Sequence, residues 1–444
     1  MKQELFLAIL YILLGNIFIL KILFDFHYAK TWTLNIWVQI FLLIYYVIVP
    51  LIMIISSGLL GRYLGNWPDL TINHEHYCSF GTFISVMLFF TAYTIIILIP
   101  LKLFSVIQIN LKLGNFLSFP LIKLAIILIV IFAYLSFFIY VKGYHGLSNL
   151  IKLAPYLESP VFQEELYLKY GRFHRYFLRF VPMIIYPALF FFFFKRRYER
   201  LFFIILPVII YLIYTLLTRE RQATILLILV FIIGFLIKYQ RIFSKGFLIV
   251  CVILLLLFPF ITFINKTFSF DVEAYRQIKN AINIDYIIKE FNFEQIALYI
   301  SQNATYKKFI FDDFINSLFG NFLPTSLRYK EPLNNLNSYF FMGQLSHSIP
   351  PGIIASGYYH LGNFGIIIWG MILGITVKLT ESIFNSLMYY DRNMAYPYAF
   401  SFLAFFAYIR TGILGFSLYR PFYVFFLIII LIGYRFYISE KNKE

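Results

Sequence analysis

The chain has 444 residues, of which 61% are hydrophobic and 13% are charged, and its formal net charge is +16 at pH 7. Charged residues make up about 25% of a typical soluble domain, so the composition excludes an ordinary soluble protein. It predicts an all-α polytopic integral membrane protein with a single membrane domain, residues 1–444. Because the excess charge is positive, anionic lipid headgroups and phosphorylated lipid substrates are the expected partners, and nucleic acid is not.

The expected transmembrane helices follow from apolar runs of about 20 residues, the length that a bilayer requires. The first run is followed by no small-residue cleavage site, so we expect it to be retained as a span and not removed as a signal peptide. About eleven spans are predicted, at residues 4–25, 36–57, 80–101, 117–141, 177–194, 201–217, 222–238, 246–264, 351–377, 395–414 and 418–438.

Two hydrophilic connections are long enough to form structure outside the membrane, a medium loop at 142–176 and a large loop at 265–350. In the large loop, Tyr275, Ile278 and Ile282 recur at helical spacing. This spacing is typical of an amphipathic helix. The large loop is therefore predicted to form short helices that lie on the outer membrane surface.

The orientation follows from the lysines and arginines of the short loops, which are enriched on the cytoplasmic side. The densest basic short loops, KRRYER at 195–200 and KYQRIFSK at 238–245, are therefore expected in the cytoplasm. Counting spans from there places the C-terminus inside. The N-terminus, the turn at 218–221 and both long loops are then extracytoplasmic. Lys2, close to the N-terminus, favours the opposite orientation for the first span.

Two arginines occupy the short turn between the spans at 201–217 and 222–238. Each of these spans is about 26 Å long at 1.5 Å per residue, which is shorter than a hydrocarbon core of about 30 Å. Arg219 and Arg221 are therefore expected at the outer membrane interface. A guanidinium there either snorkels and pairs locally with Glu220 or binds a phosphate or pyrophosphate as a bidentate fork.

A second candidate site lies at the start of the ninth span, in the sequence SHSIPPGIIASGYYHLG. Pro350 and Pro351 suit the first turn of a helix, and the N-terminal end of a helix favours anions. His347 precedes this helix and is expected either to act as a base toward a hydroxyl or to be a polar interface residue. His360 lies inside the span and is expected to pack there and to hydrogen-bond to a neighbouring helix.

Further arginines follow in YIRTGILGFSLYRP, residues 408–421. Arg410, near the end of the tenth span, and Arg420, at the start of the eleventh, are candidate anion ligands, as is Arg328 in the large loop. Arg410 alternatively pairs with a carboxylate and holds a loop in place. No metal site is expected, because the two cysteines are far apart and HEHY at 74–77 lacks the spacing of a metalloprotease helix.

Four features together resemble the Wzy-type O-antigen and enterobacterial-common-antigen polymerases. They are short spans meeting at an arginine turn, a large outer loop with FLPTSLRYKEP, SHS before a glycine-rich span, and IRTG followed by another arginine. The family usually has one arginine at the turn, and Arg221 is the favoured counterpart because a small residue and an apolar run follow it. The resemblance extends from about residue 120 to the end, and specific residues carry it at 218–224, 322–332, 346–365 and 410–420.

The resemblance implies a GT-C-like, metal-independent membrane glycosyltransferase without a cofactor. It would lie in the bacterial cytoplasmic (inner) membrane with its active site on the extracytoplasmic face. A hydroxyl of an incoming undecaprenyl-pyrophosphate-linked oligosaccharide attacks the growing chain, and undecaprenyl pyrophosphate leaves. Candidate protein partners are a chain-length regulator and a flippase. The implied catalytic residues are His347 and Arg221, and the implied pyrophosphate ligands are Arg219, Arg221, Arg328, Arg410 and Arg420.

Three other functions stay open from the sequence. An O-antigen ligase shares the arginine turn and the histidine before a late helix. A flippase or other transporter should show paired repeats and polar residues at mid-membrane depth, whereas the charges here are interpreted as collecting at the outer interface. A membrane O-acyltransferase would need a histidine within the membrane as its base, and His360 is the candidate for that role.

Overall fold

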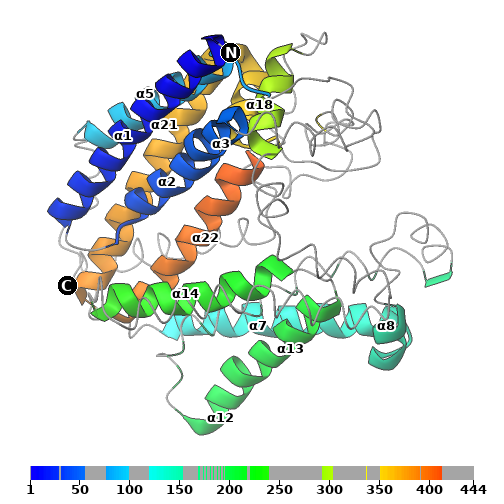
Figure 1. Ribbon diagram of the computed structural model, residues 1–444. Helices are drawn as coiled ribbons and strands as arrows, with labels where there is room; N and C mark the ends of the chain where they lie inside the picture. The colour runs from blue at the N-terminus through cyan, green and yellow to red at the C-terminus, as the bar shows by residue number, and fades with distance from the viewer. Residues whose placement is uncertain are drawn as a thin grey trace. The chain divides into compact units, whose positions relative to one another are not determined.

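All regular structure that the computed structural model describes is helical, and it falls into two compact units (Figure 1). Unit 1 comprises Met1–Ile109, Asn283–Asn385 and Ser401–Pro421, and unit 2 comprises Asn110–Ile282, Ser386–Phe400 and Phe422–Glu444. The described residues are 2–29, 32–55, 77–99, 120–153, 169–170, 174, 177, 181, 184, 188, 191, 194, 196–217, 221–239, 293–303, 337, 351–390 and 392–412.

Five of the described helices are long and apolar enough to cross a membrane. They coincide with the expected spans at 4–25, 36–57, 80–101, 117–141 and 351–377, so the chain is a helical protein suited to a bilayer. In order they are α1 (Lys2–Ala29), the run of α2 (Leu34–Leu43), η1 (Ile44–Ile48) and α3 (Val49–Ile55), then α5 (Phe80–Leu98), α7 (Pro120–Gly143) and α21 (Ile353–Tyr390).

Three more expected spans are helical. They are the run of α12 (Arg197–Arg200), η4 (Leu201–Ile205) and α13 (Leu206–Leu217), then α14 (Arg221–Tyr239), and α22 (Ala395–Thr411), which follows the turn η6 (Arg392–Met394). The expected spans at 246–264 and 418–438 lie outside the described residues, as do the amphipathic helix expected around Tyr275 and all but single positions of 177–194.

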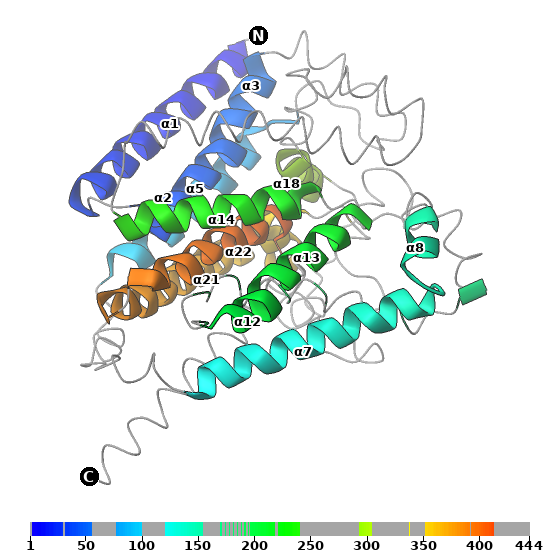
Figure 2. The same cartoon turned by 90° about the horizontal axis from the view of Figure 1, so that it is seen from below.

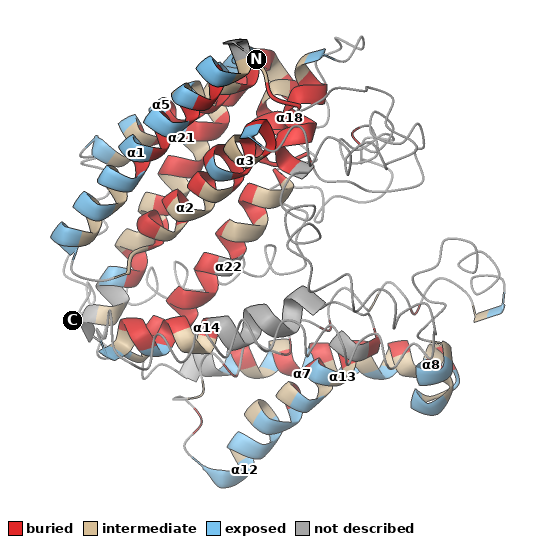
Figure 3. Cartoon of the chain, in the orientation of Figure 1, coloured by how far each residue is buried: buried red, intermediate tan, exposed pale blue. Residues whose placement is uncertain are grey.

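The burial pattern of α1 explains why this helix suits a membrane. Leu7, Tyr11, Leu14 and Phe18 recur at intervals of three and four and are all less than 6% exposed. This spacing places them in one stripe against the bundle. Most of the other large apolar side chains of the helix are exposed (Figure 3), which suits lipid and would be unfavourable in water.

In unit 1, α5 and α21 run in the same direction. A Cβ added at Gly370 of α21 would lie 2.6 Å from the carbonyl oxygen of Phe89, and one added at Gly374 would lie 2.9 Å from Cβ of Ile96. Residue numbers therefore increase in the same direction along the two helices. If both helices span the bilayer, an odd number of crossings must separate them, and the five spans expected between residues 117 and 264 satisfy that requirement.

The run from α2 to α3 has the opposite direction along α21. At one end the Asn35 N–H donates a hydrogen bond to Oε1 of Glu381, 2.7 Å away. At the other end, a Cβ added at Gly352, just before α21, would lie 2.7 Å from the hydroxyl oxygen of Tyr46. Unit 1 thus has two polar ends along α21, which we call the Gly352 end and the Glu381 end.

The helix α18 (Phe293–Asn303) belongs to the large loop but is buried at the Gly352 end. It packs against η1 and α5, and its side chains from Glu294 to Ile300 are between 0 and 7% exposed (Figure 3). This part of the large loop therefore docks on the bundle, in contrast to the surface helices expected for the loop.

Two of the spans in unit 1 contain irregular turns. A π-helical turn, η1, separates α2 from α3. Within α21, the backbone leaves helical geometry at Leu361 (φ −144°, ψ 23°) and Gly362 (φ 62°, ψ −144°). Glycine adopts the left-handed φ of position 362 without steric cost. Irregular turns of this kind inside spans are frequent at functional sites.

In unit 2, α7 and the run from α12 to α13 lie side by side (Figure 2). The Tyr134 hydroxyl of α7 donates a hydrogen bond to the Phe202 carbonyl, and further along, Tyr140 and Tyr144 share a core cluster with Leu217. The two helices therefore run parallel. A crossing between them is required if both span the membrane, as expected for 177–194.

Candidate functional site

Among the predicted site residues, Arg410 is the one whose side chain the structure describes. It lies in the last turn of α22, and its Nε is 3.5 Å from Oε1 of Glu294 on α18. The Glu294 side chain is 1% exposed and that of Arg410 is 20% exposed. The pair therefore connects the large loop to α22, which is the loop-holding arrangement expected as one alternative. A guanidinium carries five N–H donors, so the pair is compatible with a further anionic ligand.

The end of α22 and the start of α21 meet backbone to backbone beside this pair. A Cβ added at Gly412 would lie 2.1 Å from Oγ of Ser356 and 2.2 Å from the carbonyl oxygen of Gly352. Both glycines have a left-handed φ, 69° at Gly412 and 79° at Gly352. The contact therefore requires glycine at both positions, and it brings the IRTG segment next to the residue that follows SHSIPP.

Two buried hydroxyl groups lie at the same contact. Ser356 is fully buried, and its Oγ has no hydrogen-bond partner among the described residues. The Tyr46 hydroxyl, also buried, faces the first amides of α21 at Ile353 and Ile354. The Gly352 end therefore gathers two hydroxyls, a carboxylate and a guanidinium around the N-terminus of a long helix, which is an arrangement suited to polar or anionic ligands.

Two glutamines attach α18 to the start of α5. Nε2 of Gln295 donates to the Tyr77 carbonyl at 3.2 Å, and Nε2 of Gln302 donates to Oγ of Ser85 at 2.6 Å. The glutamines are seven residues apart, so they lie on one face of α18. Together with the Glu294 pair, they fix the helix to three separate parts of unit 1.

Cys78 is buried under α18, just before α5. Its Sγ receives a hydrogen bond from Nε2 of Gln295 at 3.6 Å. Burial raises the pKa of the Cys78 thiol far above its usual range, and the Gln295 bond offsets this only in part. The thiol is therefore held protonated and belongs to the packing, because a reactive cysteine needs a lowered pKa and access to solvent.

The other predicted site residues are not placed by the structure. Arg221 begins α14, but its side chain is not described, and Arg219, Arg328, His347 and Arg420 lie outside the described residues. Whether they join Arg410 therefore stays a prediction. In the described part of the chain, no group of three His, Cys, Asp or Glu side chains could hold a metal ion.

No protein-family model, curated protein or solved structure matches the chain. The resemblance to the polymerases therefore stays a prediction, and the functional argument rests on the residues themselves.

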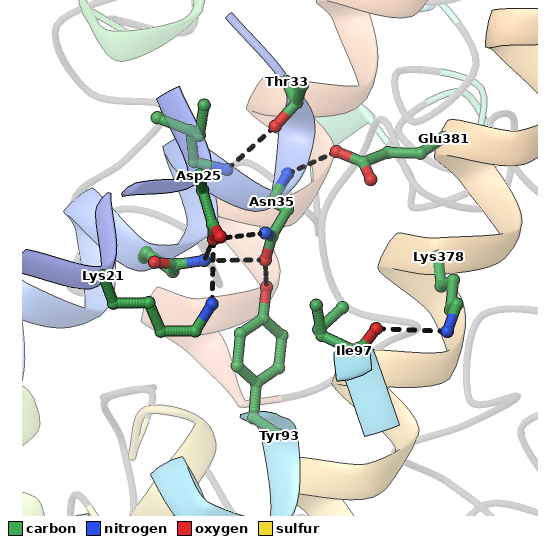
Figure 4. A network of polar contacts seen from close by, with 10 residues as sticks. Lys21, Asp25, Thr33, Asn35, Tyr93, Ile97, Lys378 and Glu381 are labelled. Carbon is green, nitrogen blue, oxygen red and sulfur yellow. Dashed lines mark hydrogen bonds and ion pairs between the residues drawn. The ribbon is translucent and has the colours of Figure 1, made fainter. Parts of the chain in front are cut away.

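A polar network at the Glu381 end was not anticipated from the sequence (Figure 4). Oδ2 of Asp25 accepts hydrogen bonds from Lys21 (2.8 Å), Asn35 (3.0 Å) and Gln39 (2.7 Å). The Tyr93 hydroxyl donates to Oδ1 of Asn35 at 2.6 Å. The network therefore joins α1, α2 and α5, and the Glu381 bond to the Asn35 amide adds α21.

Lys378 extends the polar groups of this end along α21. Its ammonium donates to the carbonyls of Ile96 and Ile97 at 3.3 and 3.1 Å, and also to that of Ile99. These carbonyls end α5, where a cation satisfies the unpaired acceptors and the helix dipole. Lys378 is thus a C-terminal cap supplied by a different helix.

The sequence contained a signal for this network, namely charged residues inside apolar runs. Lys21 and Asp25 interrupt the first run, and Lys378 and Glu381 follow the ninth. The interpretation that charges collect at the outer interface was therefore incomplete. Pairing across helices removes the cost of placing such groups in a span, and that pairing depends on contacts between distant segments.

His360 is buried in α21 directly before the break in the helix. It is 1% exposed, and its Nδ1 accepts a hydrogen bond from Nε1 of Trp369 at 3.2 Å. The expectation that His360 packs inside the span is met, and this bond joins the two halves of α21 rather than α21 to a neighbour. Trp369 in turn packs edge-on against Tyr408 of α22.

Proposed function

We propose that the chain is a membrane glycosyltransferase that polymerises undecaprenyl-pyrophosphate-linked oligosaccharide repeat units. The reaction would take place on the extracytoplasmic face of the bacterial cytoplasmic membrane. The observation that supports this proposal is the meeting of three segments at the Gly352 end, two of which carry motifs of the resemblance. They are the IRTG segment with Arg410, the start of α21 after SHSIPP, and α18 of the large loop.

The chemistry assigns a role to each charged group. A hydroxyl oxygen of the incoming unit forms a bond to the anomeric carbon of the growing chain, and the bond from that carbon to the pyrophosphate oxygen breaks. His347 takes the proton of the attacking hydroxyl. The growing negative charge on the leaving pyrophosphate is stabilised by the guanidinium groups. Glu294 positions Arg410 through the ion pair. The pyrophosphate ligands are Arg219, Arg221, Arg328, Arg410 and Arg420.

A deletion strain tests the reaction class. Loss of a polymerase should leave lipid A-core capped with a single repeat unit and remove the ladder of longer chains, because export and ligation still operate. The measurement is a gel of the surface glycan. Uncapped core alone would indicate a ligase or a flippase. An unchanged ladder would show that the protein is not needed for making this glycan.

Variants of Arg410 separate a chemical role from a structural one. Arg410→Ala should abolish the ladder, and Arg410→Lys should restore it only in part, since an ammonium cannot bind two phosphate oxygens in one fork. The charge swap Arg410→Glu with Glu294→Arg is the decisive control, because it keeps an ion pair but moves the positive charge. We expect the swapped protein to melt near wild type in detergent and to make no ladder. A ladder from the swapped protein would show that Arg410 acts only by pairing.

The same gel tests the two residues proposed for catalysis. Arg221→Ala and His347→Ala should each leave a single repeat unit on the core, with a rate loss of about 100- to 1000-fold expected for one electrostatic contact to the transition state. Protein abundance in the membrane is measured in parallel. A full ladder from well-expressed Arg221→Ala protein would show that Arg221 does not bind the pyrophosphate in the reaction.

A flippase or transporter is the second candidate function, and two observations favour it. Charged and amide side chains form a network between spans at the Glu381 end, and α21 is interrupted at Leu361 and Gly362. Transporters place polar residues and broken helices within the membrane. Uncapped core in the deletion strain, together with lipid-linked repeat units accumulating in the inner leaflet, would support this alternative.

A further inference from the structure

The turn between α7 and α8 (Leu147–Leu153) in unit 2 carries a cluster of aromatic rings that the proposed function does not use. Its members are Tyr140, Tyr144, His145, Tyr170 and His174, which we call the tyrosine turn. The Tyr170 ring centroid lies 5.3 Å from that of Tyr144 and 5.5 Å from that of His145. Tyr140, Tyr144 and His174 are buried, whereas His145 is exposed and Tyr170 is half-buried. The cluster thus has a buried base and an accessible edge.

The backbone holds His145 in an unusual position. The amide of Gly146 donates to the Val141 carbonyl at 3.0 Å, and the amide of His145 donates to the Lys142 carbonyl at 2.9 Å. These bonds end α7 in a left-handed turn, with φ of 60° at His145. Glycine is the favoured residue at this place. The turn fixes the position of His145 at the exposed edge of the cluster.

The Tyr170 ring is held by a hydrogen bond to its hydroxyl and has a lysine close to it. Nδ2 of Asn149 donates both to the Tyr170 hydroxyl at 3.2 Å and to the Tyr144 carbonyl at 2.9 Å. The ammonium of Lys169 lies 5.5 Å from the centre of the Tyr170 ring. Lys169 is exposed, as are Lys142 and Lys152 at the same turn. An aromatic ring with one ammonium group, that of Lys169, over it is therefore present at the surface of unit 2.

We propose that the tyrosine turn binds an acidic sugar unit, a pyranose that carries a carboxylate. The apolar C–H face of a pyranose packs on an aromatic ring, which here is Tyr170. The carboxylate would be met by Lys169 in a charge-assisted hydrogen bond, and sugar hydroxyls by the His145 imidazole. The subsite rests on the proposed function for the source of its ligand, the lipid-linked oligosaccharide.

Saturation-transfer NMR on the full chain in phosphatidylcholine nanodiscs tests the proposal, with sodium glucuronate and glucose as separate probes. We expect transfer to glucuronate and weaker transfer to glucose. Tyr170→Ala should reduce the glucuronate signal by roughly fivefold, the scale of one aromatic contact, and Tyr170→Phe should keep most of it because the ring remains. Equal signals from Tyr170→Ala and wild type would overturn the proposal.

Two further variants guard against misfolding and against simple charge attraction. Lys169→Gln changes an exposed side chain, and it should weaken the glucuronate signal while leaving the glucose signal unchanged. Tyr198→Ala is the matched control, because Tyr198 is also an exposed tyrosine of unit 2 with a cation, Arg196, 5.9 Å from its ring. A matching loss with Tyr198→Ala, or displacement of glucuronate by an equal concentration of inorganic phosphate, would indicate nonspecific anion binding and refute the subsite.

The binding measurement needs no turnover, so the subsite and the proposed function can fail separately. Glucuronate binding together with an unchanged glycan ladder in the deletion strain would keep the subsite and refute the polymerase. Loss of the ladder without glucuronate binding would refute the subsite alone.

Discussion

Gly412 shows how a single residue determines the Gly352 end of unit 1. We expect Gly412→Ala to destabilise the protein, because the new Cβ would lie within 2.2 Å of both Oγ of Ser356 and the Gly352 carbonyl oxygen. The left-handed φ alone costs a non-glycine residue about 1–2 kcal/mol. Thermal unfolding in detergent measures the effect. Gly15→Ala is the control, since its Cβ would lie 3.3 Å from the movable Cγ1 of Val47; equal melting of the two variants would contradict the close contact.

Cys78 provides a test of burial at the same end. Because burial raises the pKa of its thiol, little thiolate forms at pH 8, and Cys78 should resist maleimide in a Cys251→Ser protein. Labelling should become fast only after denaturation. Rapid labelling of the native protein would mean that α18 leaves its place readily.

The pH dependence of stability follows from the same shift. An unfolded thiol ionises near pH 8.5, whereas the folded Cys78 thiol keeps its proton to a higher pH. The unfolded state therefore loses protons first, and stability should fall as the pH rises above about 8.5. Cys78→Ala should remove this part of the decline, as measured by melting temperature between pH 7 and 10. A decline of unchanged size in the variant would assign it to other groups.

At the residue scale, the sequence could indicate which side chains are unusual but not what they touch. Arg410 stands out as a charge at the end of an apolar run, and either anion binding or pairing with a carboxylate explained it equally well. The partner, Glu294, is far away in the chain and sits in a segment without a motif. Only the docking of α18 decides that the two side chains meet.

The attachment of α18 is the feature to test at the scale of an element. Gln302→Ala removes two hydrogen bonds, to Oγ of Ser85 at 2.6 Å and to the Gly81 carbonyl at 3.2 Å. Their loss should lower stability by about 1–3 kcal/mol. Hydrogen exchange of residues 293–303 should become faster. Asn303→Ala is the matched control, because its side chain bonds within the helix, to the Tyr299 carbonyl. Unchanged exchange in Gln302→Ala would indicate that packing alone holds α18.

The polar network at the Glu381 end gives a separate prediction about stability. Tyr93→Phe keeps the ring but removes the 2.6 Å hydrogen bond to Asn35, leaving a buried acceptor with one donor fewer. We expect a lower melting temperature in detergent, equivalent to about 1 kcal/mol. Tyr198→Phe, at an exposed position, should melt like wild type. Equal melting of both variants would show that the network adds nothing to stability.

Long apolar helices could be predicted from the sequence because their length and composition are local properties. The five described helices that are long and apolar enough to cross a membrane appear at the expected places. The docking of α18 could not be predicted from the sequence, because the helix carries Glu294, Gln295 and Gln302, which suggest a surface helix when taken alone. The break in α21 was equally hidden, since Gly362 is one of several glycines in that span and only the backbone shows at which one the helix is interrupted.

At the scale of the whole molecule, the shared direction of α5 and α21 constrains the topology. Cysteine labelling from outside the cell tests it directly. Asn335→Cys in the large loop should react, and Arg197→Cys in the basic loop should not, because short basic loops stay in the cytoplasm. Cys251 is replaced in both proteins. Labelling at position 197 but not at 335 would show that the orientation is opposite to the predicted one, with the Gly352 end in the cytoplasm.

The membrane class could be predicted for the whole chain because it is an average property, carried by 61% hydrophobic and 13% charged residues. The division into two units could not. Unit 1 takes residues from the beginning of the chain and from two later stretches. Such an arrangement follows from packing between remote helices, and no local pattern in the sequence marks the boundary at residue 109 or 283.

The composition of unit 1 has a consequence for how the protein is made. A ribosome delivers α1 to α5 first, then residues 110–282 of unit 2, and α18 with its partners in α21 and α22 only near the end. The buried carboxylate of Glu294 can therefore form its ion pair only after Arg410 has been synthesised. A nascent chain that stops before α22 lacks the guanidinium that pairs with this carboxylate, so the ion pair between the large loop and α22 forms only once nearly the whole chain has been made.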